Sequence, residues 1–228
     1  MVKYRKIDKS HFTWVLLAAL FSHFLSVWSW WGNEGMTTRY RVAIIGSGPA
    51  GLSAAARAAV LGLTHVLLEK TDHLSDTIYK YQKGKHVMAT PSQLVLRSDI
   101  DFGVGKREVI LDTWDSQTGD HKVNVLYNSE VKAIEGERGS FSLQLTNGAV
   151  IEAETVILAI GTQGNPNLMR CDGGALPHIQ YTLDDPGAYI DEHIAVIGAG
   201  DAGIENALGL AADPEQRNTV TIVNRNAE

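Results

Sequence analysis

The chain has 228 residues, a formal net charge of −6 at neutral pH and 44% hydrophobic residues. This composition is typical of a globular protein, and the acidic balance without a long basic run argues against a nucleic-acid partner. The single cysteine excludes an internal disulfide framework, which suits a reducing compartment.

The first distinct segment, residues 12–31, is 20 residues long and contains no Asp, Glu, Lys or Arg. This length predicts a helix that spans a bilayer, with tryptophans at the membrane interface and the preceding lysines on the cytoplasmic side. The alternative is that translation starts at Met36, a few residues before the first predicted strand. A membrane-spanning helix predicts a single-pass membrane anchor, whereas a start at Met36 predicts a cytoplasmic protein.

A glycine-rich motif follows, between a short apolar run at 41–45 and a helix-forming stretch at 52–61. This arrangement is typical of a strand, a tight turn and a helix that bind a dinucleotide. The first glycine allows the turn, the second lets the backbone approach a pyrophosphate, and the third permits close packing of the helix. The predicted cofactor-binding residues of this first motif are Gly46, Ser47, Gly48, Pro49, Ala50 and Gly51.

A second strand is predicted at 65–69, and it ends in Glu69, 18 residues after Gly51. This spacing is close to that at which a carboxylate binds the hydroxyl groups of a ribose. The sequence therefore predicts a ribose-binding acid at Glu69, and we include the adjacent Lys70 in the predicted site.

A polar insertion, residues 75–105, carries a basic and aromatic cluster between Tyr79 and His86. Two interpretations of this cluster stay open. Its lysines either face water, or they form a surface that attracts an anionic acceptor or an acidic protein.

A helix is predicted over 106–115, with Val109, Ile110 and Trp114 on one face. Short β-rich runs follow, two of them joined by a strong hairpin signal. These predicted strands cover 124–127, 130–135, 141–146 and 149–152. Helices on one side of a parallel sheet, with an antiparallel β-meander on the other, predict a three-layer α/β fold.

A second glycine motif repeats the arrangement between predicted strands at 191–197 and 219–223. Its predicted cofactor-binding residues are Gly198, Gly200, Asp201, Ala202 and Gly203. In place of the acid, this unit has Asn224 followed by Arg225, which we also include in the predicted site. A carboxylate would repel a 2′-phosphate, whereas an amide and a guanidinium accept one through hydrogen bonds. The sequence therefore predicts NADP(H), with NAD(H) as the alternative.

The order of the two glycine motifs, the meander and the segment from Thr155 to Thr162 resembles the two-dinucleotide-binding flavoproteins. These are the pyridine nucleotide-disulfide oxidoreductases, and the resemblance is strongest to their thioredoxin reductase-like branch. It covers about residues 38–228 and implies a three-layer FAD/NAD(P)-binding Rossmann-like fold. The implied domains are a tail at 1–37, an FAD-binding domain at 38–191 and the start of an NAD(P)-binding domain at 192–228. Further residues implied near FAD are Val131, Ala159 and Gly161.

The resemblance implies an FAD-dependent NAD(P)H oxidoreductase that passes hydride from NADPH through FAD to an acceptor. Thioredoxin reductases carry a Cys-x-x-Cys pair before the second motif, and the lone Cys171 of this chain disfavours that dithiol route. The acceptor is therefore expected to be a small molecule or a small redox protein. We predict no metal ligand and leave the catalytic residues unassigned.

Two alternatives to this function stay open. One is a flavin monooxygenase-like enzyme, because Gly174 and His178 match part of the monooxygenase signature, although we interpret His178 as structural. The other is an inactive nucleotide-binding fragment.

The chain stops just after the second strand of its second nucleotide-binding unit, where similar proteins continue. We therefore expect a truncated protein that binds FAD weakly and NADP(H) more weakly still. The oligomeric state stays open, with a homodimer as one alternative.

Overall fold

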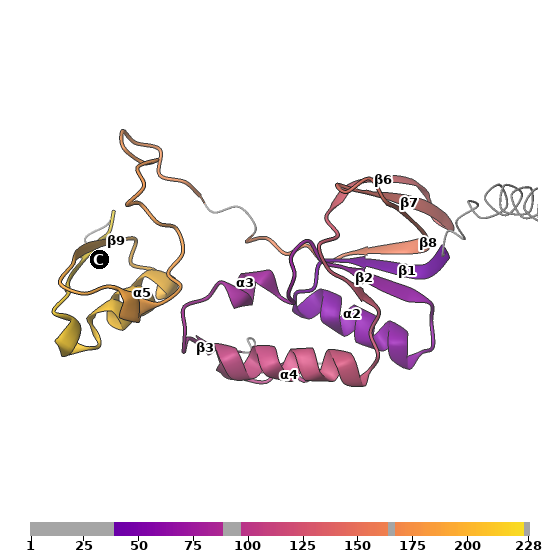
Figure 1. Ribbon diagram of the computed structural model, residues 1–228, viewed down its shortest axis with the longest axis horizontal. Coiled ribbons are helices and arrows are strands. Elements are labelled where there is room, and N and C mark those ends of the chain that lie inside the picture. The colour runs from indigo at the N-terminus through magenta and orange to yellow at the C-terminus, as the bar shows by residue number, and fades with distance from the viewer. Residues whose placement is uncertain (1–38, 89–96, 164–166, 226–228) are drawn as a thin grey trace, which may run out of the picture. The chain divides into compact units, whose positions relative to one another are not determined.

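The computed structural model describes residues 39–88, 97–163 and 167–225 (Figure 1). The predicted membrane-spanning segment 12–31 and the alternative start at Met36 lie outside these ranges. Among the residues described, no helix has both the length and the apolar character needed to cross a bilayer.

The larger sheet has six strands in the order β5-β2-β1-β8-β7-β6. Strands β5, β2, β1 and β8 run parallel, and β7 and β6 continue the sheet in antiparallel pairing. The bounds are β1 (Arg39–Ile45), β2 (His65–Leu68), β5 (Val125–Leu126), β6 (Val131–Glu137), β7 (Ser140–Leu145) and β8 (Val150–Leu158). The predicted run 149–152 and the segment from Thr155 form the single strand β8, which belongs to both the parallel sheet and the meander.

Helix α2 (Pro49–Val60) connects β1 to β2, as predicted. Pro49 occupies the first turn, where its missing N–H costs no hydrogen bond. Gly62 follows the helix with a φ of +66°, and its N–H donates to the carbonyl of Ala59. The strongest local signals in this unit, proline at the start and glycine past the end, therefore mark the helix correctly.

Helix α4 (Arg107–Asp120) is longer than the predicted 106–115. Its buried positions are Ile110, Trp114 and Thr118, which are spaced four residues apart and share one face. Val109 is 59% exposed, so the prediction that it shares the buried face was wrong. The reason is geometric, because adjacent helical residues point about 100° apart and only one of them can face the sheet.

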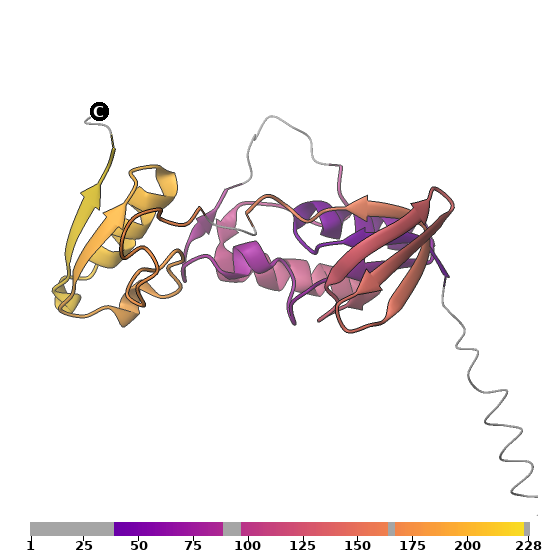
Figure 2. The same ribbon diagram turned by 90° about the horizontal axis from the view of Figure 1, so that it is seen from above.

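Alternating side chains along β1 build two apolar cores, one on each face of the sheet. Ile44 packs with Leu52 and Trp114 of the two helices. Ile45 packs on the opposite face with Leu143 of β7. Helices α2 and α4 therefore cover one face, and the meander curls over the other (Figures 1 and 2). This is the predicted three-layer α/β arrangement.

The insertion contains the short elements α3 (Asp76–Tyr79), β3 (His86–Val87) and β4 (Gly105–Lys106), and β3 pairs antiparallel with β4. Three lysines of its basic cluster pair with carboxylates. These pairs are Lys80 with Asp76, Lys83 with Asp185 and Lys85 with Glu205. The pairing neutralises their charge, which argues against the interpretation of this cluster as an anion-attracting surface.

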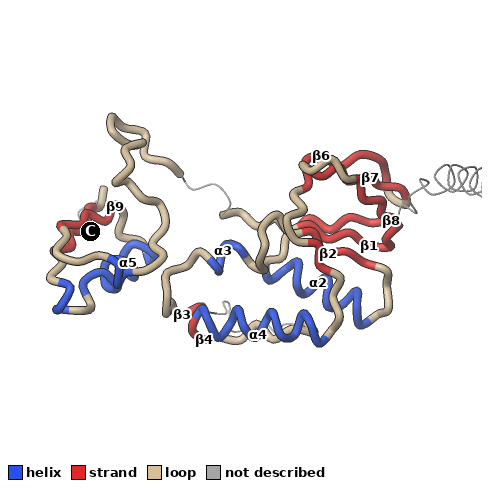
Figure 3. Tube along the Cα trace, in the orientation of Figure 1, coloured by secondary structure: helices blue, strands red, loops and turns tan. Residues whose placement is uncertain are grey.

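The smaller sheet pairs β9 (His193–Ile197) in parallel with β10 (Thr219–Val223), and α5 (Asp201–Ala211) connects them. This strand-helix-strand unit repeats the order of β1, α2 and β2, and Figure 3 labels its β9 and α5. Ile197 is 59% and Leu208 is 65% exposed. Within the described part of the chain, the apolar side chains of this unit are therefore only partly covered.

Candidate functional site

The first glycine motif forms a turn that is closed at its ends and open in the middle. Gly46 has a φ of +96°, and its N–H donates to the carbonyl of Leu68 at 2.9 Å. A Cβ on Gly51 would lie 1.8 Å from the Gly46 oxygen, and a Cβ on Gly46 would lie 2.6 Å from the Ala159 oxygen. A Cβ on Gly48 would meet no atom within 4 Å. The turn therefore leaves open space next to the backbone of Gly48, where a diphosphate would approach.

The start of α2 provides hydrogen-bond donors next to this open position. Leu52 is the first residue whose N–H reaches a carbonyl of the turn, that of Gly48 at 2.9 Å. Pro49 has no N–H, so the N–H groups of Ala50 and Gly51 have no carbonyl of a preceding turn to bond. The first turn of α2 contains no acid. These donors and the positive end of the helix dipole fit an anionic group.

Glu69 follows β2, is 5% exposed and lies against the turn. Its Oε2 accepts hydrogen bonds from the Ser47 N–H at 3.0 Å and the Ser47 hydroxyl at 2.5 Å. Its Oε1 accepts from the Thr71 N–H at 3.0 Å and the Thr71 hydroxyl at 3.1 Å. The structure thus places the predicted ribose-binding carboxylate directly beside the predicted phosphate-binding turn.

Ala159 also contacts the turn, as the resemblance implied for the segment around it. Its N–H donates to the carbonyl of Ile45 at 2.8 Å, and its side chain would lie 3.3 Å from a Cβ on Gly51. Gly161, two residues further on, is exposed and has a φ of +67°. Of these two predicted residues, the structure brings only Ala159 against the glycine motif.

Lys70 follows Glu69 in sequence, and Val131 lies close to Glu69 through the backbone of a second segment. Val131 begins β6 and is half-buried beside the core under the meander. Ser129, two residues earlier, donates its N–H to the Glu69 carbonyl at 2.7 Å, which holds this segment beside the acid. The side chain of Lys70 is exposed.

Two residues of this site, Thr71 and Ser75, were missed by sequence reasoning. Ser75 is 2% exposed and has a left-handed backbone with a φ of +56°. Its N–H donates to the Ser47 hydroxyl at 2.9 Å, and its own hydroxyl donates to the Ser47 carbonyl at 2.8 Å. The one available signal was a serine directly before a short helix, which is a helix-capping pattern and indicates no role in binding.

A charged cluster surrounds His73 next to this site. The ring nitrogens of His73 lie 2.7 Å from Asp72 and 3.1 Å from Asp76, and the ring stacks on Tyr79 at 3.7 Å. The hydrogen bond from His73 holds the pKa of Asp72 below its ordinary value of 3.8. Burial acts to raise the pKa of Asp76, but hydrogen bonds from Lys80 and His73 outweigh it and lower this pKa below 3.8.

The second glycine motif repeats the geometry of the first at its second and third glycines, whereas a Cβ on its first glycine would meet no atom within 4 Å. Gly198 has a φ of +108°, and its N–H donates to the Val223 carbonyl at 2.8 Å. A Cβ on Gly203 would lie 2.1 Å from the Gly198 oxygen, whereas a Cβ on Gly200 would meet nothing within 4 Å. The first helical hydrogen bond again runs from Ile204 to the carbonyl of the second glycine, at 3.0 Å.

Equivalent positions of the two motifs carry different side chains. Glu69 and Asn224 each follow the strand residue whose carbonyl accepts a hydrogen bond from the first glycine. Ser47 in the first motif corresponds to Ala199 in the second. The second unit therefore lacks both the carboxylate and the hydroxyl that binds it, and its Asn224 and Arg225 are exposed at the end of β10.

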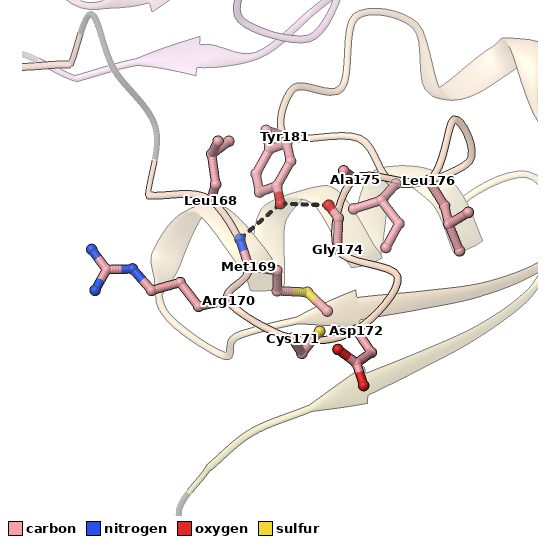
Figure 4. Close-up of a pocket in the computed structure, with 10 residues that line it drawn as sticks. Leu168, Met169, Arg170, Cys171, Asp172, Gly174, Ala175, Leu176 and Tyr181 are labelled. Atoms are coloured by element: carbon pink, nitrogen blue, oxygen red, sulfur yellow. Dashed lines mark hydrogen bonds between the residues drawn. The ribbon is translucent and has the colours of Figure 1, made fainter.

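The segment between the two units forms a cavity of about 550 Å³ (Figure 4). The hydroxyl of Tyr181 accepts a hydrogen bond from the Met169 N–H at 2.7 Å and donates to the Gly174 carbonyl at 3.2 Å. Cys171 lines this cavity and is exposed. Nowhere in 39–88, 97–163 or 167–225 do three His, Cys, Asp or Glu side chains gather in a way that could hold a metal ion.

Comparison with known proteins identifies a family. The family model described as pyridine nucleotide-disulphide oxidoreductase matches residues 43–228. The ferredoxin–NADP reductase of Gluconobacter oxydans is 28% identical over 178 residues, which are 75% of this chain and 49% of that protein. The thioredoxin reductase of Peptoclostridium litorale is 27% identical over 198 residues, 85% of this chain and 56% of that protein. The chain thus spans about half the length of the curated relatives it matches.

Solved structures share the fold. The bacillithiol disulfide reductase Bdr (YpdA) from Staphylococcus aureus matches with a TM-score of 0.71 and 23% identity, over 83% of this chain and 58% of that chain. At this identity the match shows the fold alone, and it agrees with the Rossmann-like arrangement around both glycine motifs.

Proposed function

Because the chain belongs to the pyridine nucleotide-disulphide oxidoreductase family, we propose that it is an FAD-dependent NAD(P)H oxidoreductase, or part of one. The observation that carries the proposal is the presence of two turns that are each closed by their third glycine and open at their second. One dinucleotide at each turn is the simplest use of this duplication. In this proposal the FAD-binding unit is 38–191 and the nicotinamide-binding unit begins at 192.

The residues of the first motif fit the adenosine diphosphate half of FAD. Ala50 and Gly51 would donate their N–H groups to the diphosphate, and Gly48 would let it approach the backbone. Glu69 would accept a hydrogen bond from a ribose hydroxyl, and Ala159 would pack against the turn. FAD, when bound, supplies the capacity to accept a hydride and pass electrons on.

At the second motif we propose NADP(H) rather than NAD(H). Asn224 stands where a carboxylate would favour the unmodified ribose, and Arg225 follows it. A guanidinium beside a 2′-phosphate forms charge-assisted hydrogen bonds that NAD(H) has no group to accept.

For the electron acceptor we propose a small redox protein or a small molecule. Support comes from the relatives, one of which is named a ferredoxin–NADP reductase. The chain has one cysteine, the exposed Cys171, so no pair of thiols within it could relay electrons as a disulfide. A flavin monooxygenase-like reaction is the runner-up, and His178, the residue that raised it, is exposed.

The proposal is tested by adding excess FAD to the full chain and then NADPH or NADH without oxygen. We expect loss of the flavin absorbance, faster with NADPH. Glu69→Gln should weaken FAD binding at least tenfold, because the amide NH₂ group is a donor and cannot accept the hydrogen bonds that Ser47 and Thr71 donate to the carboxylate. Glu130→Gln, at an exposed position, is the control and should leave FAD binding unchanged. Failure of the chain to bind FAD would contradict the proposal. Oxygen uptake coupled to oxygenation of a substrate would favour the monooxygenase instead.

A further inference from the structure

Four donors of the protein lie within hydrogen-bond distance of the Glu69 carboxylate. Ser47 supplies an N–H and a hydroxyl to Oε2, and Thr71 supplies an N–H and a hydroxyl to Oε1. A carboxylate offers about four acceptor positions. While all four donors bond to it, a ribose hydroxyl can bind this carboxylate only if one of them turns away.

The Ser47 hydroxyl is not free to turn away. It accepts a hydrogen bond from the Ser75 N–H at 2.9 Å, and its single proton points to Glu69 Oε2 at 2.5 Å. Ser47 is fully buried and Ser75 is 2% exposed, so breaking this arrangement would leave buried polar groups without partners. The backbone N–H groups of Ser47 and Thr71 cannot rotate as a hydroxyl can, so they keep donating to Glu69.

The Thr71 hydroxyl has a second acceptor within reach. Its oxygen lies 3.1 Å from Glu69 Oε1 and 2.9 Å from the carbonyl oxygen of His73. A hydroxyl has one proton, so it serves one of these acceptors at a time. Turning from Glu69 to His73 costs Thr71 no hydrogen bond and leaves Oε1 with room for one more donor.

We infer that Thr71 is a positioning residue that reserves Glu69 Oε1 for a ribose hydroxyl, an inference that rests on the proposed FAD site. Before the cofactor binds, the Thr71 hydroxyl donates to Oε1 and keeps the buried carboxylate hydrogen-bonded. When a ribose hydroxyl donates to Oε1, Thr71 donates to the His73 carbonyl instead. Oε2, held by Ser47, keeps the carboxylate in place throughout the exchange.

The two glycine motifs of this chain support the inference by their difference. The motif with an acid at its ribose position also has the hydroxyl of Ser47 that holds it. The motif with Asn224 has Ala199 at the position of Ser47, and so has neither member of the pair. Within one chain, the holding hydroxyl occurs with the acid that it holds.

The test is a competition experiment on the full chain, in which FAD is displaced by ADP or by 2′,3′-dideoxy-ADP. Because bound flavin is the signal, only the FAD site is measured. Thr71→Val removes the competing hydroxyl while keeping the shape of the side chain. We expect ADP to bind this variant about fivefold more tightly. In the unmodified chain, ADP binding replaces the hydrogen bond from Thr71 to the charged carboxylate with a weaker one to the His73 carbonyl, and the variant has no such bond to lose. Dideoxy-ADP, which has no ribose hydroxyl, should bind both proteins equally.

Thr71→Ser, which keeps the hydroxyl, is the matched control and should behave as the unmodified chain. An equal change for both nucleotides would mean that Thr71 only stabilises the loop, and would overturn the inference. Unchanged or weaker binding of ADP alone would overturn it as well, because Thr71 would then not compete with the ribose. If the unmodified chain binds no FAD, the proposed function fails, and the inference fails with it.

Discussion

At the scale of the residue, Ser47 shows how one hydroxyl joins three segments of the chain. It lies in the glycine motif, donates to the acid after β2 and accepts from the residue before α3. The partners are 22 and 28 residues away in sequence. The single proton of this hydroxyl is directed at Glu69 Oε2, so the Ser47 side chain holds that carboxylate in place.

Ser47→Ala should lower the free energy of unfolding by about 2 kcal/mol. The variant leaves the buried Ser75 N–H without its acceptor and removes one donor from the Glu69 carboxylate. Urea denaturation followed by circular dichroism measures the change. Ser140→Ala, at an exposed position, is the control and should change stability by less than about 0.5 kcal/mol. Equal stability of the two variants would contradict the role given to Ser47.

At the scale of the element, the turn before α2 depends on the absence of side chains. The third glycine of each motif lies against the carbonyl of the first, at distances that leave no room for a Cβ. This contact brings the start of the helix close to the end of the strand. The donors of α2 are thereby held at the position where the open second glycine allows a ligand to approach.

Gly51→Ala should abolish FAD binding and destabilise the protein by about 3 kcal/mol or more. Its Cβ would lie 1.8 Å from the Gly46 oxygen, so the backbone of the turn would have to move. Gly119→Ala in α4 is the matched control, because a Cβ there meets nothing within 4 Å. That change should leave FAD binding intact and raise stability by up to about 1 kcal/mol, as expected for alanine in a helix. Flavin fluorescence and thermal unfolding measure the two effects.

The pH dependence of α3 follows from the lowered pKa of Asp76. A carboxyl group with a lower pKa in the folded state stabilises the fold above its ordinary value of 3.8, and this contribution is lost as the pH falls through the folded pKa. Asp76→Asn should therefore cost on the order of 1 kcal/mol at neutral pH, and this cost should shrink toward zero in acid. Denaturation at several pH values measures it. The exposed Asp112→Asn is the control, and a cost that is the same at all pH values would contradict the assignment.

At the scale of the whole molecule, the insertion is joined by ion pairs to residues far along the chain. Lys83 lies 2.6 Å from Asp185, and its N–H donates to the Asp184 carbonyl at 2.8 Å. Lys85 lies 2.7 Å from Glu205 of α5 and 4.8 Å from the centre of the Tyr81 ring. Lysines that suggested a binding surface thus serve contacts within the protein.

Lys85→Glu should destabilise the protein by about 1 kcal/mol, because it places two negative charges together. Lys85→Glu combined with Glu205→Lys should restore most of this loss. The comparison of both single variants with the double variant, by urea denaturation at low salt, isolates the pair from other effects. If the double variant loses as much free energy of unfolding as the two single variants lose together, the ion pair contributes nothing to stability.

By itself, the sequence determined both strand-turn-helix units, the glycine positions and the three-layer fold class. These features depend on short-range requirements, since a glycine with positive φ, a proline in a first turn and an apolar run each leave a local pattern. The equivalence of Glu69 and Asn224 followed from their position at the end of the second strand of each unit. The structure places Glu69 and Ala159 beside the first turn, and their contact with a cofactor stays a prediction.

Only the tertiary structure decided which distant groups meet. No local sequence pattern indicates that Ser47 contacts Ser75, or that Thr71 donates hydrogen bonds to Glu69. The same is true of the ion pair between Lys83 and Asp185, which are 102 residues apart. Val109 was misplaced for the same reason, because two adjacent apolar residues compete for one buried face and the position of the sheet selects between them. Hydrogen bonds and packing form between groups that the fold brings together, so their partners become known only once the strands and helices have been placed in space.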